Sequence, residues 1–151
     1  MLIAVGADHA GFPLKQKVAE HLRASGHEVL DLGTFNTDPV DYPDYAEAVG
    51  KAIVTNQAER GVLVCGSGVG ASVAANKVRG IRAGLCHDGF SAHQGVEDDD
   101  MNVLVLGARI IGASLAYDLI KVYLEAKFQG TEERLLRRLN KVKAIEARNM
   151  C

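Results

Sequence analysis

The sequence contains no tryptophan and few aromatic residues of any kind. Phe and Tyr make up 5% of its 151 residues, whereas proteins that hold single-stranded nucleic acid stack bases on aromatic side chains. The formal net charge is −2, so the chain as a whole has no basic field for a phosphate backbone. These shortages argue against a nucleic-acid-binding protein, and we expect no nucleic-acid partner.

Cysteine is scarce as well. Cys65, Cys86 and Cys151 are an odd number and form no C-x-x-C pair, which favours free thiols in a reducing compartment over a disulfide framework. No apolar run approaches the ~18 residues that cross a bilayer, and residues 1–8 lack the basic stretch of a secretory signal. We therefore expect a cytoplasmic protein with no membrane partner.

The remaining composition is that of an ordinary globular domain, with 48% hydrophobic and 24% charged residues. At this length one hydrophobic core is expected, so residues 1–151 are interpreted as a single domain. Short apolar runs alternate with segments of helical spacing. The expected strands cover residues 2–5, 28–32, 61–65, 81–86 and 102–107. The expected helices cover residues 12–25, 45–56, 71–77, a segment from about 91, 112–127 and 131–148. This alternation predicts a parallel sheet with helices on both faces.

The last expected helix, residues 131–148, follows a sheet that is already complete. It is highly charged but keeps an apolar stripe, and it opens on an imperfect capping box at residues 131–134. A helix added in this way often packs on another chain, so we expect an oligomer. Arg134 and Arg138 share one face of it and together could grip a phosphate. From the residue pattern alone, a solvated basic face is the better interpretation.

The strongest local signal is the segment Cys65-Gly66-Ser67-Gly68-Val69-Gly70, where a buried strand runs into a glycine-rich turn and then a helix. Backbone N–H groups in such a turn point at one spot, and the helix dipole adds positive potential there. The turn is therefore expected to hold an anion, either a phosphate or an oxyanion. In this field we expect Cys65 to have a lowered pKa. The alternative is a small buried hydrophobic residue, which is what we expect of Cys86 and Cys151.

Three classes of enzyme could use this turn. A dinucleotide fold needs GxGxxG near its first strand, and the GxGxG spacing here follows the third. A cysteine phosphatase needs an arginine six positions after the cysteine, where this chain has Ala71. Proton transfer next to a carbonyl needs a base, an oxyanion hole and a polar group for the adjacent hydroxyl. Cys65, the amides of the turn and Ser67 could supply these three.

Further polar residues follow the other strands, at the edge where parallel sheets bind ligands. They include Asp8, His9, Tyr42, His87, Asp88 and Arg109. Asp8 beside His9 fits sugar hydroxyls or a phosphate better than a plain helix cap. A second acidic group, residues 98–100, lies at a helix end where it opposes the dipole. Because His or Cys at metal-ligand spacing is lacking around it, we predict no metal site.

Several segments together resemble one known family. They are residues 6–11 (GADHAG), 41–43 (DYP), 65–70 (CGSGVG), 74–83 (AANKVRGIRA) and 102–109 (NVLVLGAR). In this order they are similar to the ribose/galactose isomerase family, which includes ribose-5-phosphate isomerase B, galactose-6-phosphate isomerase subunits and allose-6-phosphate isomerases. The resemblance covers essentially the whole chain.

The resemblance implies an α/β protein with a Rossmann-like three-layer α/β/α sandwich, a five-stranded parallel sheet and an extra C-terminal helix. It implies a homodimer or homotetramer whose active sites are shared between subunits. The implied reaction interconverts an aldose phosphate and a ketose phosphate through a cis-enediol(ate), without metal or cofactor. Ribose 5-phosphate and ribulose 5-phosphate, of the pentose phosphate pathway, are the first expectation. The alternatives are a tetrose, allose or galactose phosphate, a non-catalytic sensor of phosphorylated sugars, or a nucleotide-binding domain.

The resemblance also implies a role for individual residues. Cys65 would be the base that moves a proton between C1 and C2, with Ser67 in place of the threonine of many relatives. The amides of Gly66, Gly68, Val69 and Gly70 would hold the enediolate oxygen, and Asp8 and Tyr42 would contact sugar hydroxyls. The phosphate would be bound by His9, Arg134 and Arg138, with Arg109 supplied by the partner subunit.

One departure from the family concerns two positions. Many relatives carry a histidine and then an asparagine where this chain has Asp98 and Asp99, and that histidine helps to open the furanose ring. Asp98 would then be the ring-opening catalytic residue and Asp99 a substrate-binding one, or His87 or His9 would substitute. The other interpretation is a different substrate, such as a tetrose phosphate that cannot close a furanose ring through its phosphorylated end.

Overall fold

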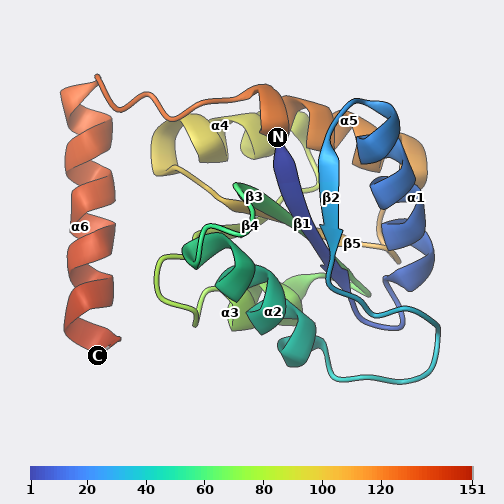
Figure 1. The fold of residues 1–151 in the computed structure, drawn as a ribbon. Helices are drawn as coiled ribbons and strands as arrows, with labels where there is room; N and C mark the ends of the chain where they lie inside the picture. Colours follow the sequence, from blue (N-terminus) through green and yellow to red (C-terminus); the bar gives the residue numbers. More distant parts are fainter. Residues whose placement is uncertain (151) are drawn as a thin grey trace.

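The computed structural model describes residues 1–150, in which strands and helices alternate along most of the chain (Figure 1). The strands are β1 (Leu2–Ala7), β2 (Glu28–Asp31), β3 (Arg60–Cys65), β4 (Ala83–Leu85) and β5 (Val103–Gly107). The helices are α1 (Phe12–Ala24), α2 (Tyr42–Val54), α3 (Val69–Ala75), α4 (Gly89–Asp99), α5 (Ala113–Glu125) and α6 (Glu133–Asn149). Among residues 1–150, no helix is both long enough and apolar enough to cross a membrane. The expectation for Cys151 lies outside the described residues.

All five strands are parallel and stand in the order β2-β1-β3-β5-β4. The central strands are apolar on both sides, and Val62, Leu63 and Val64 are completely buried. Side chains of α1, α4 and α5 pack on one face of the sheet, and those of α2 and α3 pack on the other. This arrangement confirms the predicted three-layer, Rossmann-like fold.

Some predicted boundaries were wrong for local reasons. Helix α2 begins at Tyr42 rather than at residue 45, because Pro43 fits the first turn of a helix. Strand β4 covers three residues rather than 81–86, since the N–H of Arg82 donates to Asn102 Oδ1 (2.7 Å) instead of to a neighbouring strand. The predicted capping box at residues 131–134 is also wrong, because the N-cap of α6 is Glu132 rather than Thr131, and Glu132 makes no side-chain hydrogen bond there.

Helix α6 stands apart from the three layers, beyond the sheet edge formed by β4 (Figure 1). Leu135 and Leu139 are buried, but Leu136, Val142 and Ile145 are 41%, 49% and 53% exposed. The helix therefore keeps apolar surface that its own chain does not cover.

Candidate active site

The loops that follow β1, β3 and β5 meet around one cavity of about 250 Å³ at the carboxyl edge of the sheet. Parallel neighbours end at the same edge, so residues far apart in the sequence come together there. The cavity is lined by the predicted residues Asp8, His9, Tyr42, Cys65, Gly66, Ser67, Gly68, Gly70 and Arg109. Ala10 and Ala71 complete the lining. Neither alanine was predicted as a site residue, because a methyl side chain gives no chemical signal in a sequence.

The glycine-rich turn is built from residues that tolerate close contacts. Gly68 is the N-cap of α3 and has φ +85°, and a Cβ there would lie 2.8 Å from Leu85 Cδ1. A Cβ on Gly70 would lie 2.6 Å from Cζ of Tyr42, so the tyrosine ring packs directly against the turn. The turn and the start of α2 therefore shape the cavity together.

Ser67 and Val69 are placed differently from each other. The Ser67 hydroxyl lines the cavity and accepts a hydrogen bond from the Val69 N–H at 3.3 Å. The Val69 side chain is exposed and does not line the cavity. What Val69 could offer a ligand is its backbone N–H, the group that the resemblance implies, once that N–H is released from Ser67.

Cys65 ends β3 and is buried, with 4% of its surface exposed. Burial raises the pKa of this thiol to about 12, the backbone N–H of Asp8 lowers it in part by donating to the sulfur, and the charge of Asp8 raises it further. The predicted lowering of the pKa is therefore wrong for this chain alone. The free-energy cost of removing a thiolate from water exceeds the stabilisation that the neighbouring backbone N–H provides. The sulfur carries its proton at neutral pH.

Asp8 and His9 are held by backbone groups. Asp8 Oδ1 accepts a hydrogen bond from the N–H of Gly11 at 2.9 Å, whereas the N-cap of α1 is Gly11 itself. His9 Nδ1 accepts from the N–H of Val40 at 3.1 Å. A neutral imidazole with an accepting Nδ1 carries its proton on Nε2. His9 therefore offers a hydrogen-bond donor to the cavity that it lines.

Asp98 and Asp99 do not line this cavity. They are the last residues of α4, which leads into the amino end of β5 and so to the opposite edge of the sheet. Asp98 Oδ2 accepts from Gln94 Nε2 at 2.9 Å. Burial, and then the charge of Asp98, raise the pKa of Asp99. Arg82 forms an ion pair with Asp100 at 3.0 Å, which offsets part of the unfavourable charge at this helix end.

The arginine pair also lies outside the cavity, whereas one expected partner residue lies inside it. Arg134 and Arg138 are exposed on α6. Arg109 lines the cavity of its own chain, although the resemblance implies that it serves the partner subunit. His87 is not part of the lining, and its Nε2 accepts from the N–H of Gly107 at 3.0 Å. A nitrogen that accepts this bond is not available to donate a proton to a sugar.

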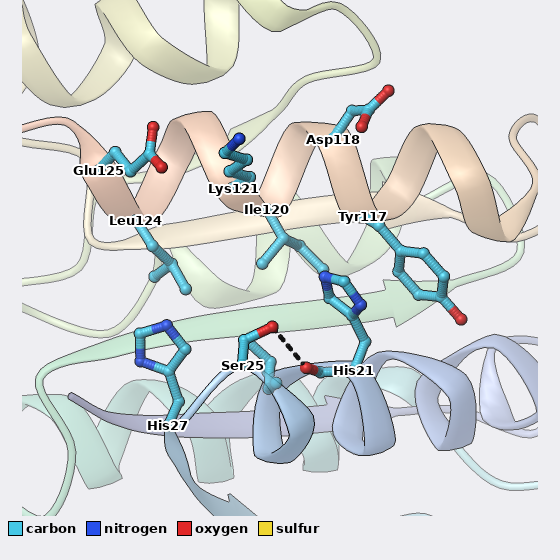
Figure 2. Close-up of a pocket in the computed structure, with 10 residues that line it drawn as sticks. His21, Ser25, His27, Tyr117, Asp118, Ile120, Lys121, Leu124 and Glu125 are labelled. Carbon is cyan, nitrogen blue, oxygen red and sulfur yellow. Dashed lines mark hydrogen bonds between the residues drawn. The ribbon is translucent and has the colours of Figure 1, made fainter.

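A hollow of about 380 Å³ lies elsewhere, between α1 and α5 (Figure 2). His21 stacks on Tyr117 there, with ring centroids 4.1 Å apart, and Leu22, Ile120 and Leu124 contribute apolar surface. Asp118 and Glu125 point away from α1 (Figure 2). This hollow is larger than the Cys65 cavity, but its lining contains no glycine-rich turn and no cysteine. Within residues 1–150, no group of three or more His, Cys, Asp or Glu is arranged to hold a metal ion.

Comparison with known proteins gives one consistent result. Residues 3–142 match the family model described as Ribose/Galactose Isomerase. Ribose-5-phosphate isomerase B of Escherichia coli strain K12 is 41% identical over 146 residues, which are 97% of each chain. D-erythrulose-4-phosphate isomerase of Pectobacterium atrosepticum is 41% identical over 132 residues, which are 85% of each chain. A solved structure of ribose-5-phosphate isomerase B from Clostridium thermocellum is 42% identical and has a TM-score of 0.95. It covers 98% of this chain, and 99% of that chain is matched.

Proposed function

Because this chain belongs to the ribose/galactose isomerase family, we propose that it interconverts ribose 5-phosphate and ribulose 5-phosphate as a cytoplasmic aldose–ketose isomerase. One observation carries the proposal: a buried thiol, the glycine-rich turn and the polar side chains of the β1 loop line the same cavity. Proton transfer between neighbouring carbons requires that set of groups within one small volume.

The proposed reaction begins with the open-chain aldose, whose C1 is an aldehyde. Cys65 removes the proton from C2, and the electron pair moves to give a cis-enediolate with its negative charge on O1. The amides of Gly66, Gly68 and Gly70 stabilise that oxyanion, and the Val69 N–H joins them once it leaves the Ser67 hydroxyl. The hydroxyl proton on O2 passes to O1, C2 becomes the ketone, and Cys65 returns a proton to C1. Neither metal nor cofactor takes part in this scheme.

Cys65 must become a thiolate for this chemistry, although burial raises the pKa of its thiol to about 12. Cationic groups near a sulfur favour its ionised form. Arg109 already lines the cavity. One arginine therefore lies in the cavity of a single chain. Further positive charge brought into the cavity would lower the pKa of the Cys65 thiol.

We place the phosphate at His9, whose Nε2–H is a donor, and at Arg134 and Arg138. The two arginines do not line the cavity of their own chain, and α6 carries exposed apolar residues. In a homodimer or homotetramer, α6 of one subunit could reach the cavity of another. This arrangement would bring the arginines to the phosphate and cover the exposed apolar residues of α6. The partner's Asp98 and Asp99 would reach the site in the same way, as the ring-opening and substrate-binding residues.

A tetrose phosphate is the second candidate substrate. Position 98 is a carboxylate that already accepts a hydrogen bond from Gln94, which makes it a weak substitute for a ring-opening histidine. A 4-phosphorylated tetrose needs no ring opening, because its terminal hydroxyl is esterified. The relative from Pectobacterium atrosepticum, 41% identical, is named D-erythrulose-4-phosphate isomerase.

The test is turnover across tetrose, pentose and hexose phosphates under the same conditions. We expect the highest kcat/KM with ribose 5-phosphate. A clear preference for a tetrose phosphate would select the second candidate. Saturable binding without turnover of any sugar phosphate would contradict both and would favour a sensor.

A further inference from the structure

Lys15 is a charged side chain inside the protein. It stands in the first turn of α1 and is 0% exposed, although lysine is rarely fully buried unless it is paired. Its Nζ donates to both carboxylate oxygens of Asp31, at 2.7 and 2.9 Å, and to the carbonyl oxygen of Thr34 at 2.7 Å. The rings of Phe12 and Phe35 lie 5.4 and 4.9 Å from it. The ammonium group is thus fully paired.

These contacts hold the start of the β2–α2 loop against the end of β1. Asp31 also accepts from the N–H of Gly33 at 3.0 Å. The N–H of Ala7 donates to the oxygen of Gly33 at 2.6 Å, and the N–H of Thr34 donates to the oxygen of Ala7 at 2.7 Å. Lys15 therefore fixes the segment to which the last residue of β1 is bonded.

Both ends of this arrangement lead into the cavity. Asp8 follows β1 and lines the cavity together with Cys65. Further along the loop, the N–H of Val40 bonds to His9, and Tyr42 then begins α2. Asp8, the proposed phosphate donor His9 and the tyrosine wall therefore all depend on where residues 32–41 lie.

Stability alone does not explain why the protein has an ion pair between Lys15 and Asp31. Replacing a buried ion pair by uncharged groups of similar volume is often neutral or stabilising. The contribution of Lys15 is to positioning, because one nitrogen fixes a carboxylate at the end of β2 and a carbonyl in the loop that follows it.

We propose that Lys15 is a positioning residue for the isomerase site, acting through Asp31 and Thr34 on the loop of residues 32–41. The proposal rests on the proposed function for the chemistry that is positioned. The physical effect of Lys15, which is the placement of two loops, does not depend on the proposed function.

The decisive variant is Lys15→Met combined with Asp31→Asn. Lys15→Met alone leaves a partly buried carboxylate without its cation, so its Tm should fall. The double variant removes both charges and retains an acceptor for the N–H of Gly33, so its Tm should return toward the wild-type value. We expect kcat/KM of the double variant to remain about 100-fold below the wild-type value, mostly through kcat. A displacement of about 1 Å at a reacting group can cost that much. The matched control is Lys51→Met, which removes an exposed lysine from an ion pair with Glu47 and should change neither quantity.

Backbone hydrogen exchange measures the placement directly, without turnover. In the double variant, residues 32–41 and the end of β1 should exchange at least tenfold faster, while residues 60–65 should not change. Unchanged exchange, or activity that recovers together with Tm, would overturn the proposal. If the wild-type protein does not turn over ribose 5-phosphate, only the proposed function fails, and the exchange rates still decide the role of Lys15.

Discussion

At Cys65, two effects on one thiol oppose each other. The backbone N–H of Asp8 favours the thiolate, whereas enclosure at the end of β3 disfavours it. Enclosure prevails, so the pKa of the thiol is raised to about 12. In its proposed role as the base, a Cys65 that stays protonated until the site is complete is protected from alkylation and oxidation, since the thiolate is the reactive form.

The raised pKa predicts how stability depends on pH. The folded thiol holds its proton until about pH 12, whereas the unfolded thiol releases it near its ordinary value of 9.0. The contribution of Cys65 to stability is therefore complete below about pH 9 and is lost as the pH rises toward 12. Thermal unfolding from about pH 8 to about pH 11 should show a smaller alkaline loss of Tm in Cys65→Ala than in the wild type. Tyr123 and Cys86, whose pKa values burial also raises, are common to both proteins. Parallel alkaline curves would contradict the assignment.

At the scale of elements, the turn before α3 and the start of α2 form one unit. Gly70 belongs to α3, and Tyr42 belongs to α2, and the tyrosine ring occupies the space that a side chain at position 70 would need. The two helices lie on the same face of the sheet and share a core cluster. A substitution in one helix therefore displaces the residue that the other helix contributes to the cavity wall.

Gly70→Ala tests this contact. The new Cβ would lie 2.6 Å from Tyr42 Cζ and must displace the ring. Alanine is favoured over glycine inside a helix by about 1 kcal/mol, so stability should change little. We expect KM for the sugar phosphate to rise about tenfold, the equivalent of one lost hydrogen bond of about 1.4 kcal/mol. Gly89→Ala, where a Cβ meets nothing within 4 Å, is the control. Equal KM values for the two variants would show that Tyr42 does not contact the sugar.

At the scale of the whole molecule, the proposed function leaves one chain with an incomplete site. The thiol, the turn and His9 line one cavity, while the arginine pair stands on a helix outside it. Two copies related by symmetry would complete two equivalent sites. The activity of each cavity is then predicted to require residues of the other subunit.

Subunit mixing measures this interdependence. Cys65→Ala and Arg134→Ala, each nearly inactive alone, should regain about one quarter of wild-type activity after co-refolding. Half of the randomly formed dimers are mixed, and each of those has one intact site. In the control, Cys65→Ala is mixed with Asp8→Ala. Both changes then affect groups of the same cavity, and no intact site can form. Equal recovery in the two mixtures, or none in either, would contradict shared sites.

The order and type of the elements could be predicted from the sequence because β3 and β5 are continuous apolar runs between helices of clear periodicity. The residues of the cavity could be predicted because parallel strands end at a common edge. Three features could not. The raised pKa of Cys65 depends on enclosure by loops distant in sequence. Position 98 is close to Arg109 along the chain, yet α4 and β5 carry the two to opposite edges of the sheet. The pairing of Lys15 with Asp31 crosses 16 residues and leaves no local pattern.

The most direct measurement follows deuterium from solvent into the sugar. Wild-type protein and Cys65→Ala are incubated with ribose 5-phosphate in D₂O, and carbon-bound deuterium is measured by NMR, with sugar binding checked by calorimetry. The account predicts deuterium at the product's C1 with the wild type, and binding without any incorporation above the enzyme-free level with Cys65→Ala. Incorporation by Cys65→Ala at the wild-type rate would contradict the assignment of this thiol as the base.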